Sequence, residues 1–451
     1  MSSFYLENFG CRANQAEGAA LASRLEGAGL RRQAAPEGAA WLVVNTCTVT
    51  AAADCAARHA VRRLARRHPQ ARIAVTGCYA QRAPAELAAL PGVAAVLGHQ
   101  EKWGLPARLG PRADAATAAA RPPSPDWVPA AELAPPAKLA TLARLARTRP
   151  IVKVQEGCSR HCSYCIVPQV RGASRSRPLG AVLEEITALA RAGVQEVVLS
   201  GINLGQWGRE LDRHLELAAL VEAVLRQTPI PRLRLSSVEP MDWTPGLTTL
   251  FAADPRLCRH AHLPLQSGSD TVLHRMRRRY RAARYAACVR DLHQRSPGIA
   301  IGADVLAGFP AESEAEFAET CALIQDLPLA YLHVFPFSAR PGTEADRQLT
   351  GGAWPPVPPA TIARRAATLR QLGAAKRAAF LECQCGARLT AVTLDETTAA
   401  GAAWALTGNY CRVALDRPLP PNRLVEAEIT AAEAASHLRG RVWNNAAEVG
   451  A

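Results

Sequence analysis

The sequence has 451 residues, of which 49% are hydrophobic, so two or three domains of roughly 100–200 residues can each bury a core. No apolar run reaches the roughly 20 residues of a membrane span, and Met1–Leu6 lacks the basic and apolar parts of a signal peptide, so we expect a cytoplasmic protein without a membrane segment. The net charge of +14 favours a polyanionic partner, with nucleic acid as the first candidate.

The first region, residues 1–110, alternates short apolar strands with longer helical stretches. The expected strands are Phe4–Glu7, Trp41–Asn45 and Ile73–Thr76, and the expected helices are Gln15–Gly27 and Thr50–Arg67. Strand–helix–strand alternation predicts an α/β domain with a doubly wound parallel sheet. The Pro- and Ala-rich stretch that follows, residues 111–138, has no clear period and is interpreted as a linker.

The second region, residues 139–372, also alternates predicted strands with helical stretches. Its expected strands are Ile151–Gln155, Glu196–Ser200, Arg232–Ser236, His260–Leu265, Ile299–Leu306 and Leu332–Phe337. Six βα units predict a partial (β/α)6 barrel, because a closed barrel of this type needs eight.

The last region, residues 373–451, changes character after a short helical stretch. Short strands are expected at Arg388–Leu394, Ala402–Leu406, Cys411–Leu415 and Leu424–Ile429. Because Gly and Pro punctuate these strands, the region is predicted to be a small C-terminal β-barrel.

Three cysteines stand close together just after the first predicted barrel strand. Cys158, Cys162 and Cys165 form a C-x-x-x-C-x-x-C pattern. Thiolates at such spacing wrap one metal centre, and three of them leave one iron of a [4Fe–4S] cube open, where S-adenosylmethionine can bind. The alternative is a structural zinc site, which normally takes two C-x-x-C pairs, and no second such pair follows.

Polar residues at the ends of the later barrel strands predict a pocket for that cofactor. They are Asn203, Glu239, Gln266, Ser267 and Asp304. The carboxyl ends of barrel strands face one mouth, where such groups can hold ribose and amino acid moieties. Each of them, taken alone, could instead cap a helix.

Three further cysteines follow the three predicted strands of the first region. Cys11, Cys47 and Cys78 each stand just past a strand's carboxyl end. In an open parallel sheet those ends face one crevice, so a second three-cysteine cluster is predicted there. The alternative is that they are small buried apolar side chains.

Basic residues gather in three segments. Arg58–Arg67 and Arg275–Arg284 are Arg-rich, and Arg171, Arg175 and Arg177 follow the central cysteines. Such faces can track a phosphate backbone, although a solvated helix face has the same composition.

These residues resemble the methylthiotransferases of the radical S-adenosylmethionine superfamily over nearly the whole chain. The motifs are Gly10–Cys11 with Asn14–Gln15, Asn45–Thr50, Thr76–Gln81, the central cysteines and His262–Ser269. The resemblance implies an N-terminal cluster domain, a radical barrel and a C-terminal RNA-binding TRAM domain. It implies that Cys158, Cys162 and Cys165 carry the catalytic radical cluster, and that Cys11, Cys47 and Cys78 carry an auxiliary [4Fe–4S] cluster that presents sulfur.

The branch of the family sets the expected substrate. Asn45–Thr50, Gly201–Leu204 and Leu235–Pro240 resemble the branch that adds a methylthio group at C2 of N6-threonylcarbamoyladenosine, at tRNA position 37 beside the anticodon. The N6-isopentenyladenosine branch and the branch that modifies a small-subunit ribosomal protein are the alternatives. An iron–sulfur electron carrier that binds RNA is the non-enzymatic alternative.

The implied partners are the tRNA anticodon stem-loop and a reductase or flavodoxin-type electron donor, and the sequence predicts no particular oligomeric state. The chain departs from the family at Ala311, where Gly is usual, which concerns the local turn. The tail from Gly386 onward carries six Arg against seven acidic residues, so bulk charge does not drive RNA binding there.

Overall fold

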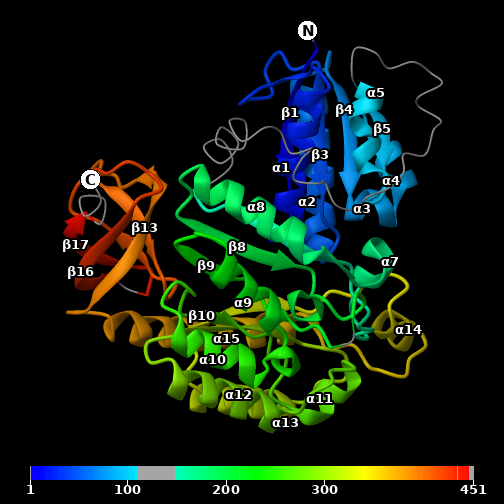
Figure 1. Cartoon of the computed structure of the whole chain (residues 1–451). Helices are drawn as coiled ribbons and strands as arrows, with labels where there is room; N and C mark the ends of the chain where they lie inside the picture. The colour runs from blue at the N-terminus through cyan, green and yellow to red at the C-terminus, as the bar shows by residue number, and fades with distance from the viewer. Residues whose placement is uncertain (1, 110–147, 213, 434, 446–451) are drawn as a thin grey trace.

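The computed structural model describes residues 2–109, 148–212, 214–433 and 435–445 (Figure 1). The predicted linker, 111–138, lies outside these residues. In Figure 1 the N-terminal domain stands on the central barrel, and the C-terminal barrel lies at the side of the central barrel. Within the described residues, no helix is both long enough and apolar enough to cross a membrane.

The N-terminal domain is built on a five-stranded parallel sheet in the order β2-β1-β3-β4-β5. The strands are β1 Ser3–Asn8, β2 Arg31–Arg32, β3 Trp41–Thr46, β4 Arg72–Gly77 and β5 Val93–Leu97. Helices α1 (Arg12–Gly27) and α5 (Leu105–Leu109) pack on one face through Leu21, Leu25 and Leu105. Helices α2 (Ala51–Arg67) and α4 (Pro84–Ala88) pack on the other through Val61 and Leu87. The predicted doubly wound sheet is therefore confirmed.

The central domain contains the six predicted parallel strands. They are β6 Ile151–Glu156, β8 Glu196–Gly201, β9 Arg232–Leu235, β10 His260–His262, β11 Ala300–Ala307 and β12 Tyr331–Pro336. They form two sheets, β7-β6-β8-β9 and β10-β11-β12, where β7 (Arg175–Ser176) pairs antiparallel with β6. Parallel bridges from Leu233 to Leu257 and from Ser237 to His262 join the sheets into one open barrel.

Helices cover the outside of this barrel. They are α8 Leu179–Arg191, α9 Leu217–Gln227, α10 Pro245–Ala253, α12 Ala282–Arg295, α13 Glu314–Asp326 and α15 Pro359–Glu382. Ile301, Ala303 and Val305 of β11 belong to the core beneath the helices. Because side chains alternate along a strand, Gly302 and Asp304 face the barrel interior.

The C-terminal domain is a closed five-stranded barrel in the order β13-β14-β15-β17-β16. Its strands are β13 Arg388–Thr397, β14 Ala403–Thr407, β15 Arg412–Ala414, β16 Leu424–Glu433 and β17 His437–Asn445. Helix α15 leads into it and runs through residue 372, where the sequence places a domain boundary. Arg234 of β9 docks the two barrels by donating to the carbonyls of Thr407 (2.9 Å) and Gly408 (3.0 Å).

Candidate active site

The first three cysteines, here called the auxiliary trio (Cys11, Cys47 and Cys78), lie at one edge of the N-terminal sheet. Cys11 is the N-cap of α1, Cys47 follows β3, and Cys78 follows β4 as the first residue of α3 (Cys78–Arg82). Burial, with the neighbouring Cys78 and Cys11 thiols, raises the pKa of Cys47 to about 11. The structure thus brings the three thiols together, as the parallel topology predicts.

Gly10 leaves the space that this arrangement needs. Its φ is +99°, and a Cβ there would lie 2.5 Å from the Cβ and 2.8 Å from the Sγ of Cys47. An L side chain would therefore meet both a strained backbone and the sulfur.

The second set, here called the radical trio (Cys158, Cys162 and Cys165), lies on the loop after β6. Burial, with the nearby Cys162 thiol, raises the pKa of Cys165 to about 12. The loop is held by its backbone: the Cys158 N–H donates to the carbonyl of Gly172 (3.0 Å), and the Ser163 N–H donates to that of Met276 (3.1 Å). A metal at either trio has to displace protons from such thiols, which iron does readily.

N–H donors already point at the sulfur atoms. The Arg160 backbone N–H donates to Cys158 (3.4 Å), the guanidinium of Arg278 donates to Cys162 (3.4 Å), and that of Arg171 donates to Cys78 (3.2 Å). Such donors favour thiolate over thiol, because charge-assisted hydrogen bonds stabilise the anion. The surroundings of both trios therefore fit anionic sulfur ligands.

The sulfur atoms of each trio are not close enough together, as placed, to bind one zinc ion. All six cysteines are among the described residues, and in neither trio do the three sulfurs all lie within 4.8 Å of one another. Thiolates on one tetrahedral zinc, at Zn–S of about 2.3 Å, lie about 3.8 Å apart. A single zinc ion would therefore require the thiols of either trio to move closer together.

The predicted cofactor residues surround the radical trio to different degrees. Asn203 follows β8, its amide nitrogen lies 3.7 Å from the Cys158 sulfur, and its buried Oδ1 has no hydrogen-bond partner. Glu239 follows β9, and its carboxylate is paired with Arg278. Burial raises the pKa of Glu239. An unpaired buried acceptor beside a cluster ligand is what an absent polar ligand would satisfy.

The other three predicted residues are engaged within the protein. Gln266 is buried with φ of +64°, and its N–H donates to the carbonyl of Asp304 (2.8 Å). The hydroxyl of Ser267 lies 3.2 Å from that of Thr320 on α13, on the helix side of the barrel. The carboxylate of Asp304 lies 3.0 Å from His262 Nε2 and 3.2 Å from His333 Nδ1. These imidazoles hold its pKa well below its usual range, although burial opposes them.

Several arginines of two expected phosphate-binding segments point into the protein instead. Arg278 is buried and paired with Glu239, and Arg275 donates to the carbonyl of Ala311 (2.6 Å). Arg171 is buried beneath the auxiliary trio. For Arg171, Arg275 and Arg278 the expectation of a basic surface face is therefore wrong, because their side chains compensate carboxylates and sulfurs. Arg277, Arg279, Arg281 and Arg284 of the same segment are exposed. Composition alone gives no signal for this, and the carboxylates that pair with them are far away in sequence.

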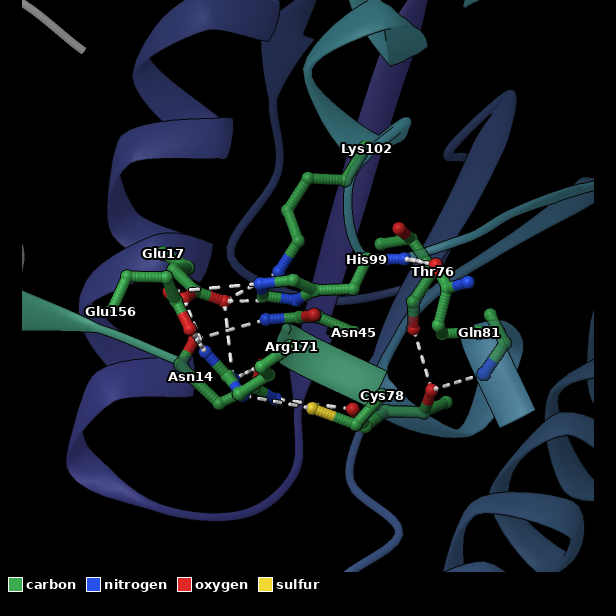
Figure 2. Close-up of polar contacts among 12 residues, drawn as sticks. Asn14, Glu17, Asn45, Thr76, Cys78, Gln81, His99, Lys102, Glu156 and Arg171 are labelled. Atoms are coloured by element: carbon green, nitrogen blue, oxygen red, sulfur yellow. Dashed lines mark hydrogen bonds and ion pairs between the residues drawn. The ribbon is translucent and has the colours of Figure 1, made fainter. Parts of the chain in front are cut away.

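The two trios lie side by side. Cys78 packs with Ile166 and Val170, which follow the radical trio in sequence. Figure 2 shows Arg171, at the end of α7 (Val167–Arg171), reaching Cys78 across this boundary. The segments that carry the two trios therefore meet at the boundary between the N-terminal domain and the barrel.

Two protein families match the chain. Residues 3–98 match "Uncharacterized protein family UPF0004", and residues 152–324 match the radical SAM superfamily. Among solved structures, the radical S-adenosylmethionine methyltransferase TsrM from Kitasatospora setae, with cobalamin and a [4Fe–4S] cluster bound, has a TM-score of 0.57 at 17% identity. That similarity covers 78% of this chain and 75% of that one, and it concerns the fold alone.

Curated relatives match over longer stretches. The threonylcarbamoyladenosine tRNA methylthiotransferase MtaB of Rickettsia prowazekii is 33% identical, over 94% of this chain and 94% of the relative. The protein of the same name from Bacillus subtilis is 36% identical, over 77% and 76%. The tRNA-2-methylthio-N(6)-dimethylallyladenosine synthase of Syntrophotalea carbinolica is 35% identical, over 76% and 78%.

Proposed function

Because the chain belongs to the radical S-adenosylmethionine tRNA methylthiotransferases, we propose that it adds a methylthio group at C2 of N6-threonylcarbamoyladenosine at tRNA position 37. The observation that carries this choice is the relative named for that nucleoside, which aligns over 94% of both chains. Membership in an enzyme family displaces the electron-carrier alternative. A tRNA substrate would place the protein in the cytoplasm.

The residues of both trios fit the cofactors of this family, S-adenosylmethionine and [4Fe–4S] clusters. When bound, the radical cluster supplies the electron that cleaves S-adenosylmethionine, and the auxiliary cluster presents the sulfur to be transferred. We assign the radical cluster to Cys158, Cys162 and Cys165, and the auxiliary cluster to Cys11, Cys47 and Cys78. The first electron would come from a separate reductase or a flavodoxin-type donor.

The five predicted pocket residues differ in which of their polar atoms can bind the cofactor. The free Oδ1 of Asn203 can accept a hydrogen bond from the cofactor's amino group, and the carboxylate of Glu239 can accept one from a hydroxyl. Gln266 lies at the strand end, where its positive φ turns the backbone. Ser267 would contribute through its backbone, since its hydroxyl faces Thr320. Asp304 would act from the barrel interior, as a carboxylate held ionised by two imidazoles.

A pocket of about 470 Å³ between the two barrels suits an RNA segment. Its basic and aromatic lining comprises Tyr331, His333, Arg370, Arg377, Tyr410 and Arg412. Arginines attract phosphate, and aromatic rings stack on unpaired bases. The hydroxyl of Tyr410 accepts a hydrogen bond from Arg12 (3.1 Å), the residue that follows Cys11. The pocket wall therefore contacts the segment that carries the auxiliary trio, and we propose that RNA reaches the site from here.

The second candidate substrate is the dimethylallyl (isopentenyl) nucleoside, favoured by the relative from Syntrophotalea carbinolica at 35% identity. Both candidates share the chemistry at C2, so they differ only in the group on N6.

Nucleoside mass spectrometry of tRNA from a deletion strain tests the proposal. We expect methylthio-threonylcarbamoyladenosine to disappear, unmethylthiolated threonylcarbamoyladenosine to accumulate, and methylthio-isopentenyladenosine to persist. The wild-type gene should restore the lost nucleoside, and the Cys158→Ala gene should not. Loss confined to the isopentenyl nucleoside would refute the proposed substrate and support the second candidate.

A further inference from the structure

A buried network of charged side chains joins the N-terminal domain to the barrel beside the auxiliary trio. The N-terminal domain contributes Glu17, His99 and Lys102, and the barrel contributes Lys153, Glu156 and Arg171. Figure 2 labels all of these except Lys153. Among the pairs, Lys153 Nζ lies 2.6 Å from Glu17, and Lys102 pairs with the same carboxylate. Charges removed from water in this way are costly unless they are compensated.

Arg171 is the member that touches sulfur, and it uses all three guanidinium nitrogens. Its Nη1 donates to Glu17 (2.8 Å) and Glu156 (2.9 Å), and its Nη2 donates to Asn14 Oδ1 (3.3 Å). Its Nε donates to Cys78 Sγ (3.2 Å). The planar fork is thus fixed by carboxylates on one side and aimed at the cysteine on the other.

The charges in this network do not balance without the cysteine. Arg171, Lys102 and Lys153 are three cations, whereas Glu17 and Glu156 are two anions. Burial lowers the pKa of His99 to about 4, so it adds no charge at neutral pH. One positive charge is left over beside the Cys78 sulfur. Burial raises the pKa of the Cys78 thiol although Arg171 lowers it, so this charge would be compensated when the sulfur binds iron as a thiolate.

We propose that Arg171 is a positioning residue for the auxiliary cluster, which holds the Cys78 thiolate by an N–H···S hydrogen bond and keeps the cluster's reduction potential raised. This inference rests on the proposed assignment of that cluster to Cys11, Cys47 and Cys78. Hydrogen bonds and positive charge at cluster sulfurs favour the reduced, more negative state. Because α7 follows the radical trio directly, Arg171 also ties the two cluster-bearing segments to each other.

The test uses the full chain with Cys158, Cys162 and Cys165 changed to Ala, so that the measured signals come from the auxiliary cluster alone. Three substitutions are then added to this variant one at a time: Arg171→Gln, Arg171→Lys and, as the matched control, Lys153→Met. Lys153→Met removes one cation from the same network, and Lys153 pairs with the carboxylates of Glu17 and Glu156. The midpoint potential is measured by redox titration followed by electron paramagnetic resonance, and iron retention is measured against a chelator.

We expect Arg171→Gln to lower the midpoint potential and to weaken iron retention by about ten- to hundredfold, as loss of an outer-shell partner typically does. Arg171→Lys keeps the charge and should lower the potential by less. Lys153→Met should shift the potential least. The inference is overturned if both Arg171 variants keep the parent's potential, or if Lys153→Met shifts it as far as Arg171→Gln. A parent protein that holds no iron would instead refute the proposed auxiliary cluster itself.

Discussion

Arg278 illustrates how single residues serve both cofactor and fold. Its guanidinium donates to the Cys162 sulfur (3.4 Å) and pairs with the buried carboxylate of Glu239. Neither partner is near it in sequence, so the Arg-rich segment 275–284 suggests a surface face although this side chain is buried. Residue-level roles of this kind depend on which chain segments meet, and a single sequence does not contain that information.

Arg278→Met should destabilise the protein strongly. It removes the cation that pairs with the largely buried Glu239 carboxylate, and breaking a buried pair from one side costs about 3–5 kcal/mol. Urea unfolding monitored by circular dichroism measures this loss. Arg281→Met is the matched control, because its pair with Asp270 at 3.6 Å is exposed and should be worth at most about 0.5 kcal/mol. Equal, small losses for both variants would contradict the buried pairing.

His99 should make stability depend on pH in the mildly acidic range. Burial, with the nearby Lys102, lowers its pKa from 6.5 to about 4 in the folded protein. The unfolded chain therefore binds a proton that the folded chain does not, so stability is complete above pH about 6.5 and falls toward pH about 4, by about 3 kcal/mol at most.

His99→Gln should flatten this decline in unfolding free energy, measured in urea at half-unit steps between pH 4.5 and 7. Some slope remains, because burial also holds the pKa of His260 well below its ordinary value. The carboxylates of Glu17 and Glu156, whose pKa values are lowered by neighbouring cations against the effect of burial, contribute only at lower pH. Identical slopes for the two proteins would show that His99 titrates normally.

Gly10 provides a residue-scale test of the auxiliary trio. A Cβ at this position would lie 2.8 Å from the Cys47 sulfur, at a φ of +99°. After reconstitution, Gly10→Ala should hold about four irons per chain instead of about eight, given one four-iron cube for each trio. Gly27→Ala, at the open end of α1 with no atom within 4 Å, is the control and should keep both clusters. Full iron content in Gly10→Ala would place the cluster elsewhere.

At the scale of elements, the turn before α13 carries Ala311 with φ of +61°, a conformation that favours glycine. The turn survives because the Ala311 N–H donates to the Pro355 carbonyl (2.8 Å), and its own carbonyl accepts from Arg275 (2.6 Å). The departure from the family at this position is thus accommodated as local backbone strain.

Ala311→Gly should therefore stabilise the protein by about 0.5–1 kcal/mol, since relief of the left-handed strain exceeds the added freedom of the unfolded chain. Ala315→Gly, at an exposed site inside α13, should destabilise by a similar amount. Differential scanning calorimetry measures whether each variant is more or less stable than the wild type. A loss of stability in Ala311→Gly would mean that the hydrogen bonds leave no strain to relieve.

Much of the fold can be predicted from sequence at this scale, because strand periodicity and turn residues are local signals. Four strands escape that reasoning: β2, β5, β7 and β17. Strand β5 lies at the sheet edge and is alanine-rich, and β17 carries Arg, Gly and Asn, so neither has the usual strand composition. The boundary placed at residue 372 falls inside α15, whose Gly373 packs closely on Leu332.

At the scale of the whole molecule, three domains converge on one site. The N-terminal sheet carries the auxiliary trio, the barrel carries the radical trio, and the C-terminal barrel contributes Tyr410, which contacts Arg12 beside Cys11. The position of each trio was predictable, because strand ends and motif spacing are properties of the sequence. Their adjacency through Cys78 and Ile166, and the buried network beneath them, depend on how the domains dock.

The most direct test of the account is a reconstituted reaction with S-adenosylmethionine, dithionite and tRNA bearing threonylcarbamoyladenosine. The wild-type chain should form both 5′-deoxyadenosine and the methylthio nucleoside, as measured by mass spectrometry. A variant with Cys11, Cys47 and Cys78 changed to Ala should still form 5′-deoxyadenosine but no methylthio nucleoside, because the auxiliary trio is assigned to sulfur transfer alone. Methylthio product from that variant, or no 5′-deoxyadenosine from an iron-replete wild type, would contradict the two-cluster account.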